Sequence, residues 1–392
     1  MERQSKRLRI GPLTILQINR NNFWEKFDSF HEENRYLSDD VKLSVQKVCS
    51  SVVSIGSFAK KFKFLGTGTI IGCDKINDNR YVSSVLTSAS LFGASNKNYN
   101  VTSNDEFKVE VYFDERTFQV HEFSYDGHYN IALLKFESTT SMLIASLKSV
   151  EVIRGAARER LLRRRSEVCR ISANDQLIAV GRYFNEPFSL MAAPGAFSHG
   201  CCSLDCPPLL KTTCIISKCG TGGPLINGDG EIIGINFFAE GYTPFLPMNI
   251  ILKCLEYFEK NGRFVRPSIG IRGANLCDAT SLSTLEKISQ KFPDVSKGIL
   301  VKEVVPQSPA YHAGICAGDV LTSCGRNIIK SVVEFEATLF NRIGNSLEVQ
   351  VLKQRGQFEE KIVVVGETSP DNFFSWPLPK ERRVILKSSP RH

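Results

Sequence analysis

The sequence has few of the features that indicate cross-linking, secretion or membrane insertion. Only 12 of its 392 residues are cysteine, far below the density of a disulfide scaffold. No window approaches the roughly 18 apolar residues of a membrane span. The apolar stretch at 10–18 is short and interrupted, and no small-residue cleavage site follows it. We therefore predict a soluble intracellular protein with free thiols, and favour the cytoplasm or nucleus over an organelle.

There is also little excess of positive charge outside one segment. The formal net charge is +8, and residues 154–165 contribute +5 of it, from six arginines and one glutamate. No aromatic residue interleaves with these arginines, so a base-stacking surface is not indicated. The composition argues against a general nucleic-acid binder. Two interpretations of Arg154–Arg165 stay open: a solvated loop insertion, and a basic scaffold that contacts nucleic acid.

Short β-branched runs separated by turn residues dominate the first two thirds of the chain. Asn-Gly-Asp-Gly at 227–230 is a strong hairpin signal between two such runs. Many short strands at this spacing predict an all-β barrel or sandwich. A helix closes the region, with Asn249 as its expected N-cap and Gly262 as its end. The runs lie at 52–55, 66–71, 81–87, 109–113 and 131–136.

A second module follows a linker at 263–267. A strand opens at 298–301, and Ser308 and Pro309 predict the cap and first residue of a short helix that Gly314 stops. Ser331 and Glu334 form the pattern of a capping box for a helix that extends to about Phe340. A hairpin over 347–365 completes the module. The tail is rich in proline and charge.

One Gly-rich turn, Lys218-Cys219-Gly220-Thr221-Gly222-Gly223-Pro224, carries a single hydroxyl at its apex. Gly222 and Gly223 permit backbone angles that a Cβ forbids, and Pro224 fixes the direction in which the chain leaves. Such a turn can present a nucleophile beside free backbone N–H groups, which is what acyl transfer requires. The turn resembles the nucleophile loop of trypsin-like serine proteases, with Thr221 in the place of serine.

The order and spacing of these segments resemble the HtrA family, also called Do-like or Deg proteases, and more narrowly a plant-type Do-like member with a degenerate triad. The resemblance covers about residues 48–366 and implies a mainly β fold, a trypsin-like double β-barrel followed by a C-terminal α+β PDZ domain. It implies an N-terminal arm at 1–47, a protease-like domain at 48–265, a PDZ domain at 266–367 and a flexible tail at 368–392. Its motifs include Gly66-Thr67-Gly68, Leu86-Thr87, Ile131-Ala132-Leu133-Leu134, Gly234-Ile235-Asn236 and Arg266 to Ile271.

The resemblance also locates three catalytic positions, and none keeps its usual residue. Ser90 stands where the family has its general base histidine, and Asn130 stands where it has the orienting aspartate. Ser90 cannot hold a proton taken from the Thr221 hydroxyl near pH 7, and an amide brings no charge to stabilise an imidazolium. We predict that these positions do not catalyse, and that no imidazole reaches the Thr221 hydroxyl.

The oxyanion donors would be the N–H groups of Cys219 and Thr221. Cys219 replaces a glycine, and a residue with a Cβ pays a penalty if the position needs a positive φ. His128, two residues before Asn130, and His199 are minor candidates for a substitute base. Cysteines cluster from 201 to 219 without paired metal-ligand spacing, so we predict no metal site and no cofactor.

Peptide binding is the function that this pattern favours. By resemblance, Ile269-Gly270-Ile271 presents N–H groups to a peptide's C-terminal carboxylate, and Phe335 and Leu339 line the groove. The predicted partners are protein C-termini and unfolded segments, and the family implies trimers of one or several kinds of chain. The leading hypothesis is therefore an inactive homologue that binds peptides and modulates active relatives. The alternatives are an endopeptidase that uses Thr221 and the basic scaffold described above.

Overall fold

The computed structural model describes residues 37–59, 62–92, 108–153, 168–183, 189–200, 202, 204, 206–279, 282–292, 295 and 297–368. Three predicted features lie mostly or wholly outside these ranges. They are the N-terminal arm up to residue 36, the Arg154–Arg165 segment and the tail after Thr368.

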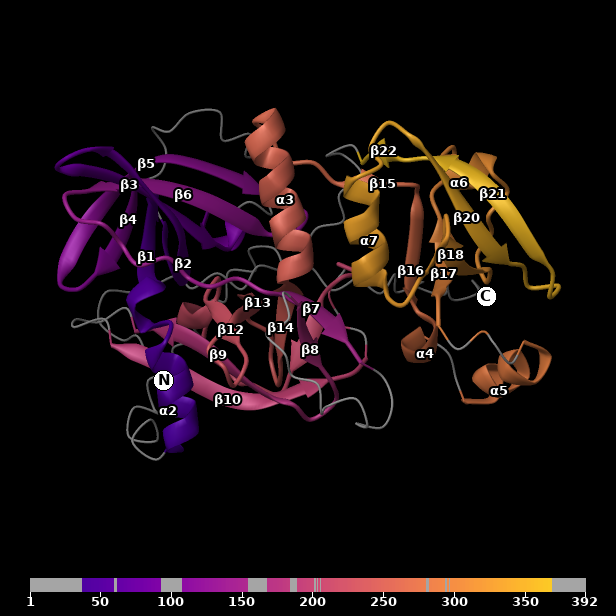
Figure 1. The fold of residues 1–392 in the computed structure, drawn as a ribbon, viewed down its shortest axis with the longest axis horizontal. Coiled ribbons are helices and arrows are strands. Elements are labelled where there is room, and N and C mark those ends of the chain that lie inside the picture. Colours follow the sequence, from indigo (N-terminus) through magenta and orange to yellow (C-terminus); the bar gives the residue numbers. More distant parts are fainter. Residues whose placement is uncertain are drawn as a thin grey trace, which may run out of the picture.

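Two closed six-stranded barrels form the first part of the molecule (Figure 1). The first has the strand order β1-β2-β3-β6-β5-β4, and the second has the order β10-β11-β14-β13-β12-β9. The strands of the first barrel are β1 (Val52–Ala59), β2 (Phe62–Asn77), β3 (Arg80–Thr87), β4 (Lys108–Phe113), β5 (Arg116–Asp126) and β6 (Ile131–Ser138). Those of the second are β9 (Gln176–Arg182), β10 (Leu190–Ser198), β11 (Leu210–Thr212), β12 (Pro224–Ile226), β13 (Ile232–Asn236) and β14 (Thr243–Pro247). This arrangement confirms the predicted fold class.

The sequence signals for strands were reliable where one face is buried. All five β-branched runs fall within strands, and residues 227–230 connect β12 to β13 in an antiparallel pair. β5 was not predicted, because most of its side chains are exposed or only half-buried and many are polar. A register shift between Val120 and Glu122 also interrupts the alternation of its apolar residues. β7 (Ser149–Val152) and β8 (Val168–Ile171) pair in parallel beside the second barrel.

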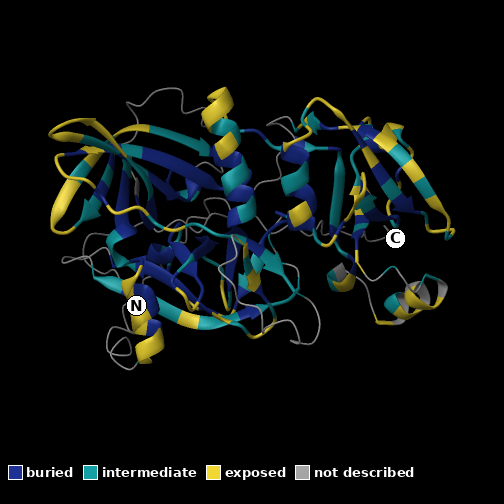
Figure 2. Cartoon of the chain, in the orientation of Figure 1, coloured by how far each residue is buried: buried dark blue, intermediate teal, exposed yellow. Residues whose placement is uncertain are grey.

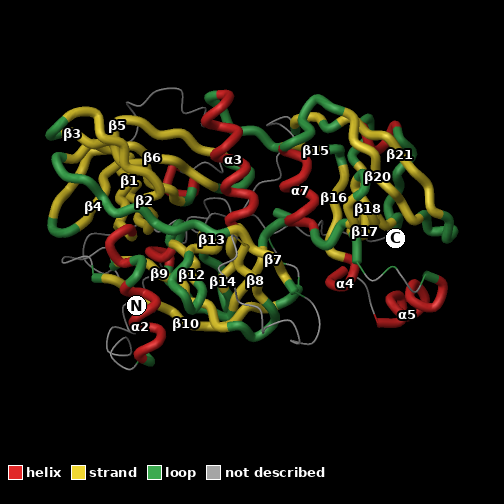
Figure 3. Tube along the Cα trace, viewed as in Figure 1, coloured by secondary structure: helices red, strands yellow, loops and turns green. Residues whose placement is uncertain are grey.

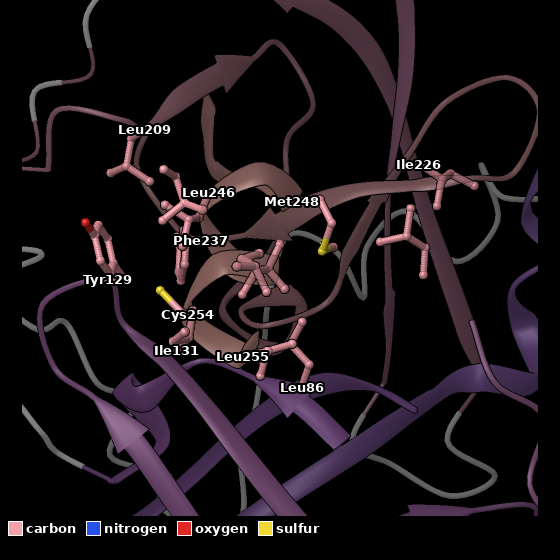
Figure 4. Packing of buried hydrophobic residues seen from close by; sticks show 14 of the residues in the cluster. Leu86, Tyr129, Ile131, Leu209, Ile226, Phe237, Leu246, Met248, Cys254 and Leu255 are labelled. Carbon is pink, nitrogen blue, oxygen red and sulfur yellow. The ribbon is translucent and has the colours of Figure 1, made fainter. Parts of the chain in front are cut away.

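A hydrophobic cluster fills the space between the barrels and the helix that follows them (Figure 4). It includes Leu86 and Ile131 of the first barrel, Ile226 and Leu246 of the second, and Cys254 of α3 (Met248–Asn261). Because both barrels contribute to it, their relative position is fixed by burial. α2 (Asp39–Gln46) packs on the second barrel, where the Ser44 hydroxyl donates to the Gly228 carbonyl at 2.6 Å.

The C-terminal cap of α3 agrees with the prediction from the sequence, and the N-terminal cap does not. Gly262 has a φ of +68° and caps the C-terminus, as predicted. Asn249, however, is not the N-cap, because Pro247 precedes the first helical residue. Asn249 instead holds β7: its Oδ1 accepts from Val150 N at 2.8 Å, and its Nδ2 donates to Val150 O at 3.0 Å.

The PDZ domain is built on a sheet with the order β16-β17-β18-β20-β21, in which β16 lies at one edge. Ser308 and Ser331 cap α6 and α7 with their hydroxyls, as predicted. The Glu334 carboxylate accepts from Lys330 N at 3.1 Å. α4 and α5 were not predicted. The elements are β15 (Pro267–Ser268), β16 (Ile271–Asn275), α4 (Leu276–Ala279), α5 (Leu282–Lys291), β17 (Ile299–Val304), α6 (Pro309–His312), β18 (Val320–Cys324), β19 (Asn327–Ile328), α7 (Val332–Phe340), β20 (Ser346–Leu352), β21 (Phe358–Val364) and β22 (Gly366–Glu367).

Helix α7 joins the PDZ domain to the barrels. It packs beside α3, and Figure 3 shows the two helices between the strands of the two parts. Its Val333 and Phe340 belong to the inter-barrel cluster, while Phe335 and Leu339 belong to the PDZ core. Both helices are therefore buried on the sides that face each other (Figure 2). No helix among the described residues is long and apolar enough to cross a membrane.

Candidate functional site

The Gly-rich turn lies where the two barrels meet. Lys218–Gly220 form a single 3-10 turn, and Thr221 follows in an extended conformation. The Thr221 carbonyl accepts from Thr67 N at 2.9 Å, and the Thr67 hydroxyl donates to the Cys219 carbonyl at 2.7 Å. On the other side, Gly222 N donates to the Asn236 carbonyl at 2.8 Å. Backbone contacts from both barrels therefore hold the turn.

Gly222 allows this close approach. Its φ is +83°, and a Cβ there would lie 2.6 Å from the Thr67 carbonyl oxygen and 2.8 Å from Ser88 N. A side chain at this position would meet backbone that cannot move aside. The contact also places the apex of the turn beside the segment that leads from β3 to Ser90, so two of the three triad positions share one region.

One of the two expected backbone donors of this turn is already engaged. Thr221 N donates to the Lys218 carbonyl at 3.0 Å, which closes the 3-10 turn. This N–H cannot stabilise an oxyanion unless that hydrogen bond breaks. Cys219 is buried and is not among the described non-glycine residues with a positive φ. The turn therefore has a conformation that Cys219 adopts without strain, and the Thr221 donor is already used.

Ser90 and Asn130 form a hydrogen-bonded pair. Asn130 Nδ2 donates to Ser90 Oγ at 2.8 Å, and its Oδ1 accepts from Ser90 N at 2.8 Å and from Ser88 Oγ at 3.0 Å. Asn130 is 3% exposed and has a φ of +55°, a conformation that asparagine tolerates better than most residues. The two residues thus keep the mutual placement expected of a base and its orienting group, with neither the base nor the charge.

His128, a candidate for a substitute base, lies in a buried turn beside Arg266. β6 begins only at Ile131, so His128 lies in the preceding turn and not on the strand. It is fully buried, and its Nδ1 lies 2.9 Å from Nη1 of Arg266. Since a guanidinium only donates, Nδ1 accepts. Burial, with the nearby charge of Arg266, holds the pKa of His128 well below its usual value, so the ring stays neutral.

The cysteine-rich segment is mainly structural. Cys206, Cys214 and Cys219 are buried, and the Cys214 thiol donates to the Leu177 carbonyl at 3.6 Å. Burial raises the pKa of the Cys206 thiol well above its usual range, which disfavours the reactive thiolate. Among the described residues, no group of three or more His, Cys, Asp or Glu side chains is placed to hold a metal ion.

A groove lies between β16 and α7. Of the five residues predicted to bind peptide, Ile269, Ile271, Phe335 and Leu339 line it. Gly270, with a φ of +85°, shapes its closed end: a Cβ there would lie 2.0 Å from the Ser308 Cβ. The Gly270 N–H donates to the Ser268 hydroxyl at 2.9 Å, so a bound carboxylate would replace that hydroxyl.

The groove contains residues that the sequence analysis did not select. They are Pro207 from the second barrel, Arg266 from the linker, and Glu336 from α7. Glu336 is 9% exposed, and its Oε2 accepts from the Tyr129 hydroxyl at 3.0 Å. The composition of α7 did not distinguish Glu336 from Glu334, which lies on the same helix and is exposed. Burial is the main cause that raises its pKa.

Two known protein families match parts of this chain. The trypsin-like peptidase domain family matches residues 66–235, and the PDZ domain family matches residues 267–364. "Putative protease Do-like 14" of Arabidopsis thaliana is 30% identical over 323 residues, which are 79% of this chain and 66% of that protein. "Serine protease Do-like HtrA" of Lactococcus lactis subsp. cremoris is 24% identical over 336 residues, which are 78% of this chain and 77% of that protein.

Solved structures share the fold. "HtrA-type protease AlgW with tripeptide" has a TM-score of 0.55 at 18% identity, and the match covers 84% of this chain and 98% of that one. "HtrA-type protease AlgW with decapeptide" has a TM-score of 0.52 at 17% identity, with 85% of this chain and all of that one covered. The chain spans only about two thirds of the length of the plant relative.

Proposed function

The chain belongs to the HtrA (Do-like) family, and from that premise we propose that it is a catalytically inactive member that binds peptides. The observation that carries the proposal is the Ser90–Asn130 pair. A general base must accept the proton of the attacking hydroxyl, and neither a serine hydroxyl nor an amide does so near neutral pH. The Thr221 hydroxyl therefore has no activated form with which to attack a peptide bond.

A second feature of the site supports the same proposal. In acyl transfer, donors aimed at the developing oxyanion are worth about 10²–10³ in rate each. Here the Thr221 N–H is engaged with the Lys218 carbonyl. Loss of this donor and of the base together leaves too little rate enhancement for useful amide hydrolysis.

The peptide-binding half of the proposal depends on the free edge of the PDZ sheet. Among the described strands β16 pairs with β17 alone, so its other edge can add an extended peptide as a new strand. Apolar side chains of α7 form the opposite wall, and N–H groups at 269–271 lie at the end where a terminal carboxylate would bind. Unfolded segments and protein C-termini are the partners of this chemistry.

Restoring the family's usual triad residues tests whether the protein is inactive. We expect the wild type and Thr221→Ala to give the same background in a fluorescent casein assay. The triple variant Ser90→His, Asn130→Asp and Thr221→Ser should show more turnover than either, because it returns the base, the charge and the less hindered hydroxyl. Cleavage by the wild type that Thr221→Ala abolishes, or labelling of Thr221 by a fluorophosphonate, would establish the endopeptidase instead.

The test of binding uses the carboxylate end of the groove. A fluorescent peptide with a free C-terminal valine should bind the full chain, and Gly270→Glu should abolish binding because a Cβ there collides with Ser308 and displaces the backbone that presents the N–H groups. An amidated peptide is the matched control and should bind weakly. Light scattering in the same buffer tests the proposal that the chain forms trimers, alone or with active relatives.

A further inference from the structure

The PDZ sheet packs its inner face against helices α6 and α7. Val349, Val351 and Val363 lie on this face and belong to the same core as residues of both helices. Side chains alternate between the two faces of a strand, so the even-numbered residues of β21, from Phe358 to Val364, lie on the outer face. The outer face is thus separate from the PDZ core.

Helix α5 and the residues after it cover one end of the outer face. Strand pairing places Val320, Leu352 and Phe358 side by side in one row across β18, β20 and β21. Leu285 of α5 packs against this row, and the Phe292 ring meets the Phe358 ring edge-on, with centroids 5.6 Å apart. This first row therefore has an apolar cover of its own.

The described part of the chain leaves the next three rows of the outer face largely exposed. Ile362 and Val364 lie on the same side of β21 and are 71% and 50% exposed, and Ile328, across β18 and β20, is 67% exposed. A sheet with one solvated face normally places polar residues there, so exposed apolar side chains that share this face mark an interaction site. We call these rows the outer-face patch, which consists of Ile328, Ser323, Gln350 and Glu360, then Glu348 and Ile362, then Ser346 and Val364.

The outer-face patch is acidic as well as apolar. Glu348 lies opposite Ile362, and Glu360 lies opposite Gln350. Both glutamates are exposed, and neither has an ion-pair partner among the described residues. The patch itself contains no lysine or arginine. A segment that combines cations with apolar side chains therefore complements this surface.

A segment of this composition lies in the tail, outside the described residues. Residues 380–387 have a net charge of +3, from four cations and one glutamate, and contain the apolar run Val384-Ile385-Leu386. The cations are Lys380, Arg382, Arg383 and Lys387.

The tail can reach the whole patch. It follows directly after β21 and β22, and residues 369–379 separate the segment from Thr368. These residues span up to about 40 Å, while β21 is only about 24 Å long. A tether of this kind gives the segment a local concentration in about the millimolar range. The tethered segment therefore has an advantage over a second molecule.

We propose that residues 380–387 dock on the outer-face patch. The apolar run covers Ile362 and Val364, and the arginines before it pair with Glu348 and Glu360. The segment thus covers the last rows of the sheet as α5 covers the first, and it anchors one part of a tail for which the sequence predicts flexibility. The groove between β16 and α7 is not part of the patch, so the inference is independent of the proposed peptide binding.

Photo-crosslinking in the full chain tests this docking. The photoreactive amino acid p-benzoylphenylalanine replaces Ile362, which is exposed enough to accept the larger ring. After irradiation, mass spectrometry of the monomer fraction should find residues 380–387 as the main crosslinked segment. The same replacement at Leu143, an exposed apolar residue outside the PDZ domain, is the control and should not crosslink to this segment. Replacement of Val364 provides a second probe of the patch.

Charge reversal completes the test. Glu348→Lys together with Glu360→Lys should reduce the crosslink yield at least about fivefold, because two ion pairs become repulsive contacts. Adding Arg382→Glu and Arg383→Glu to that variant should restore the yield. Glu240→Lys together with Glu259→Lys, two exposed positions outside the patch, makes the same change in net charge and should leave the yield unchanged.

Three outcomes overturn the inference. The first is that neither probe in the patch crosslinks to residues 380–387. The second is that the crosslinks join two molecules, which would place a second copy on the patch. The third is a yield that charge reversal at Glu348 and Glu360 does not change.

Discussion

Asn130 accepts three hydrogen bonds through one oxygen, from Ser88 Oγ, Ser90 N and Ser90 Oγ, at 2.8–3.1 Å. It does so in a left-handed conformation, which costs most residues with a Cβ about 1–2 kcal/mol. The amide is therefore a structural centre of the β3–β6 junction. The family resemblance implies a catalytic charge at this position. Here the Asn130 amide instead holds the segment that contains Ser90.

Asn130→Ala should consequently destabilise the fold by about 3 kcal/mol, from backbone strain and from buried donors left without an acceptor. Chemical denaturation with urea measures this loss. Asn130→Gly is the matched control: it loses the same acceptor without the strain and should recover about 1 kcal/mol. Equal losses in the two variants would show that the left-handed backbone costs nothing.

His128 makes stability depend on pH. Its pKa is depressed in the folded protein, while the unfolded chain titrates near 6.5. Below that pH the unfolded state binds a proton that the folded state does not, so stability falls as pH falls, by up to about 1.4 kcal/mol per unit. Asp126 and Glu336, whose pKa values burial raises, act in the opposite direction.

Comparison with His128→Gln isolates this contribution. Between pH 7 and pH 5 the wild type should lose about 2 kcal/mol more than the variant, which has nothing to titrate at this position. Urea titrations at the two pH values measure the difference. His121→Gln, in a strand residue that is exposed, is the control and should behave as the wild type. A wild type and His128→Gln that lose stability in parallel would contradict the assignment of a neutral buried ring.

At the scale of single elements, the stability of helix α7 depends on its N-cap residue. The Ser331 hydroxyl accepts from Glu334 N at 3.2 Å. Ser331→Ala should cost about 1 kcal/mol of stability and loosen the groove wall, because the helix start loses its cap. Ser331→Asp can still accept this hydrogen bond and should keep most of the stability. Thermal unfolding gives the stability, and the Kd of a valine-ended peptide should rise in the alanine variant alone.

Elements were predictable from the sequence where one local rule determined them. Ser308, Ser331 and Gly262 cap helices as their types indicate, and 227–230 turn as expected. β5 was missed because a register shift interrupts the alternation of its apolar residues and most of its side chains are only partly buried. α5 was missed although Leu282, Leu285 and Ile288 recur at helical spacing in the sequence. Asn249 was misassigned because its amide bonds to a strand about 100 residues away in sequence, which no local pattern records.

The site was predictable only in part, because several of its contacts join residues that are far apart in the sequence. Motif order predicted the triad and groove positions, since those motifs are local. The Tyr129–Glu336 bond and the contact between Arg266 and His128 join separate domains. The engagement of the Thr221 N–H is a matter of backbone conformation. None of these follows from residue types alone.

At the scale of the whole molecule, the PDZ domain is held to the barrels by a small polar cluster inside an apolar interface. Tyr129→Phe should leave a buried carboxyl oxygen without its donor and weaken this docking by about 1–3 kcal/mol. We expect faster cleavage of the 263–267 linker in limited proteolysis. Tyr112→Phe, which loses a bond to Glu110 within the first barrel, is the control and should leave linker cleavage unchanged.

The two edge strands of the PDZ sheet affect whether the protein aggregates in solution. β16 borders α7, which leaves space for one extended chain and hinders a second sheet from stacking there. β21 forms the opposite end, where Ile362 is 71% exposed but Glu359, Glu360 and Lys361 precede it. Charges on an exposed edge discourage fibrillar growth. Neutralising these three side chains should promote polymerisation through β21.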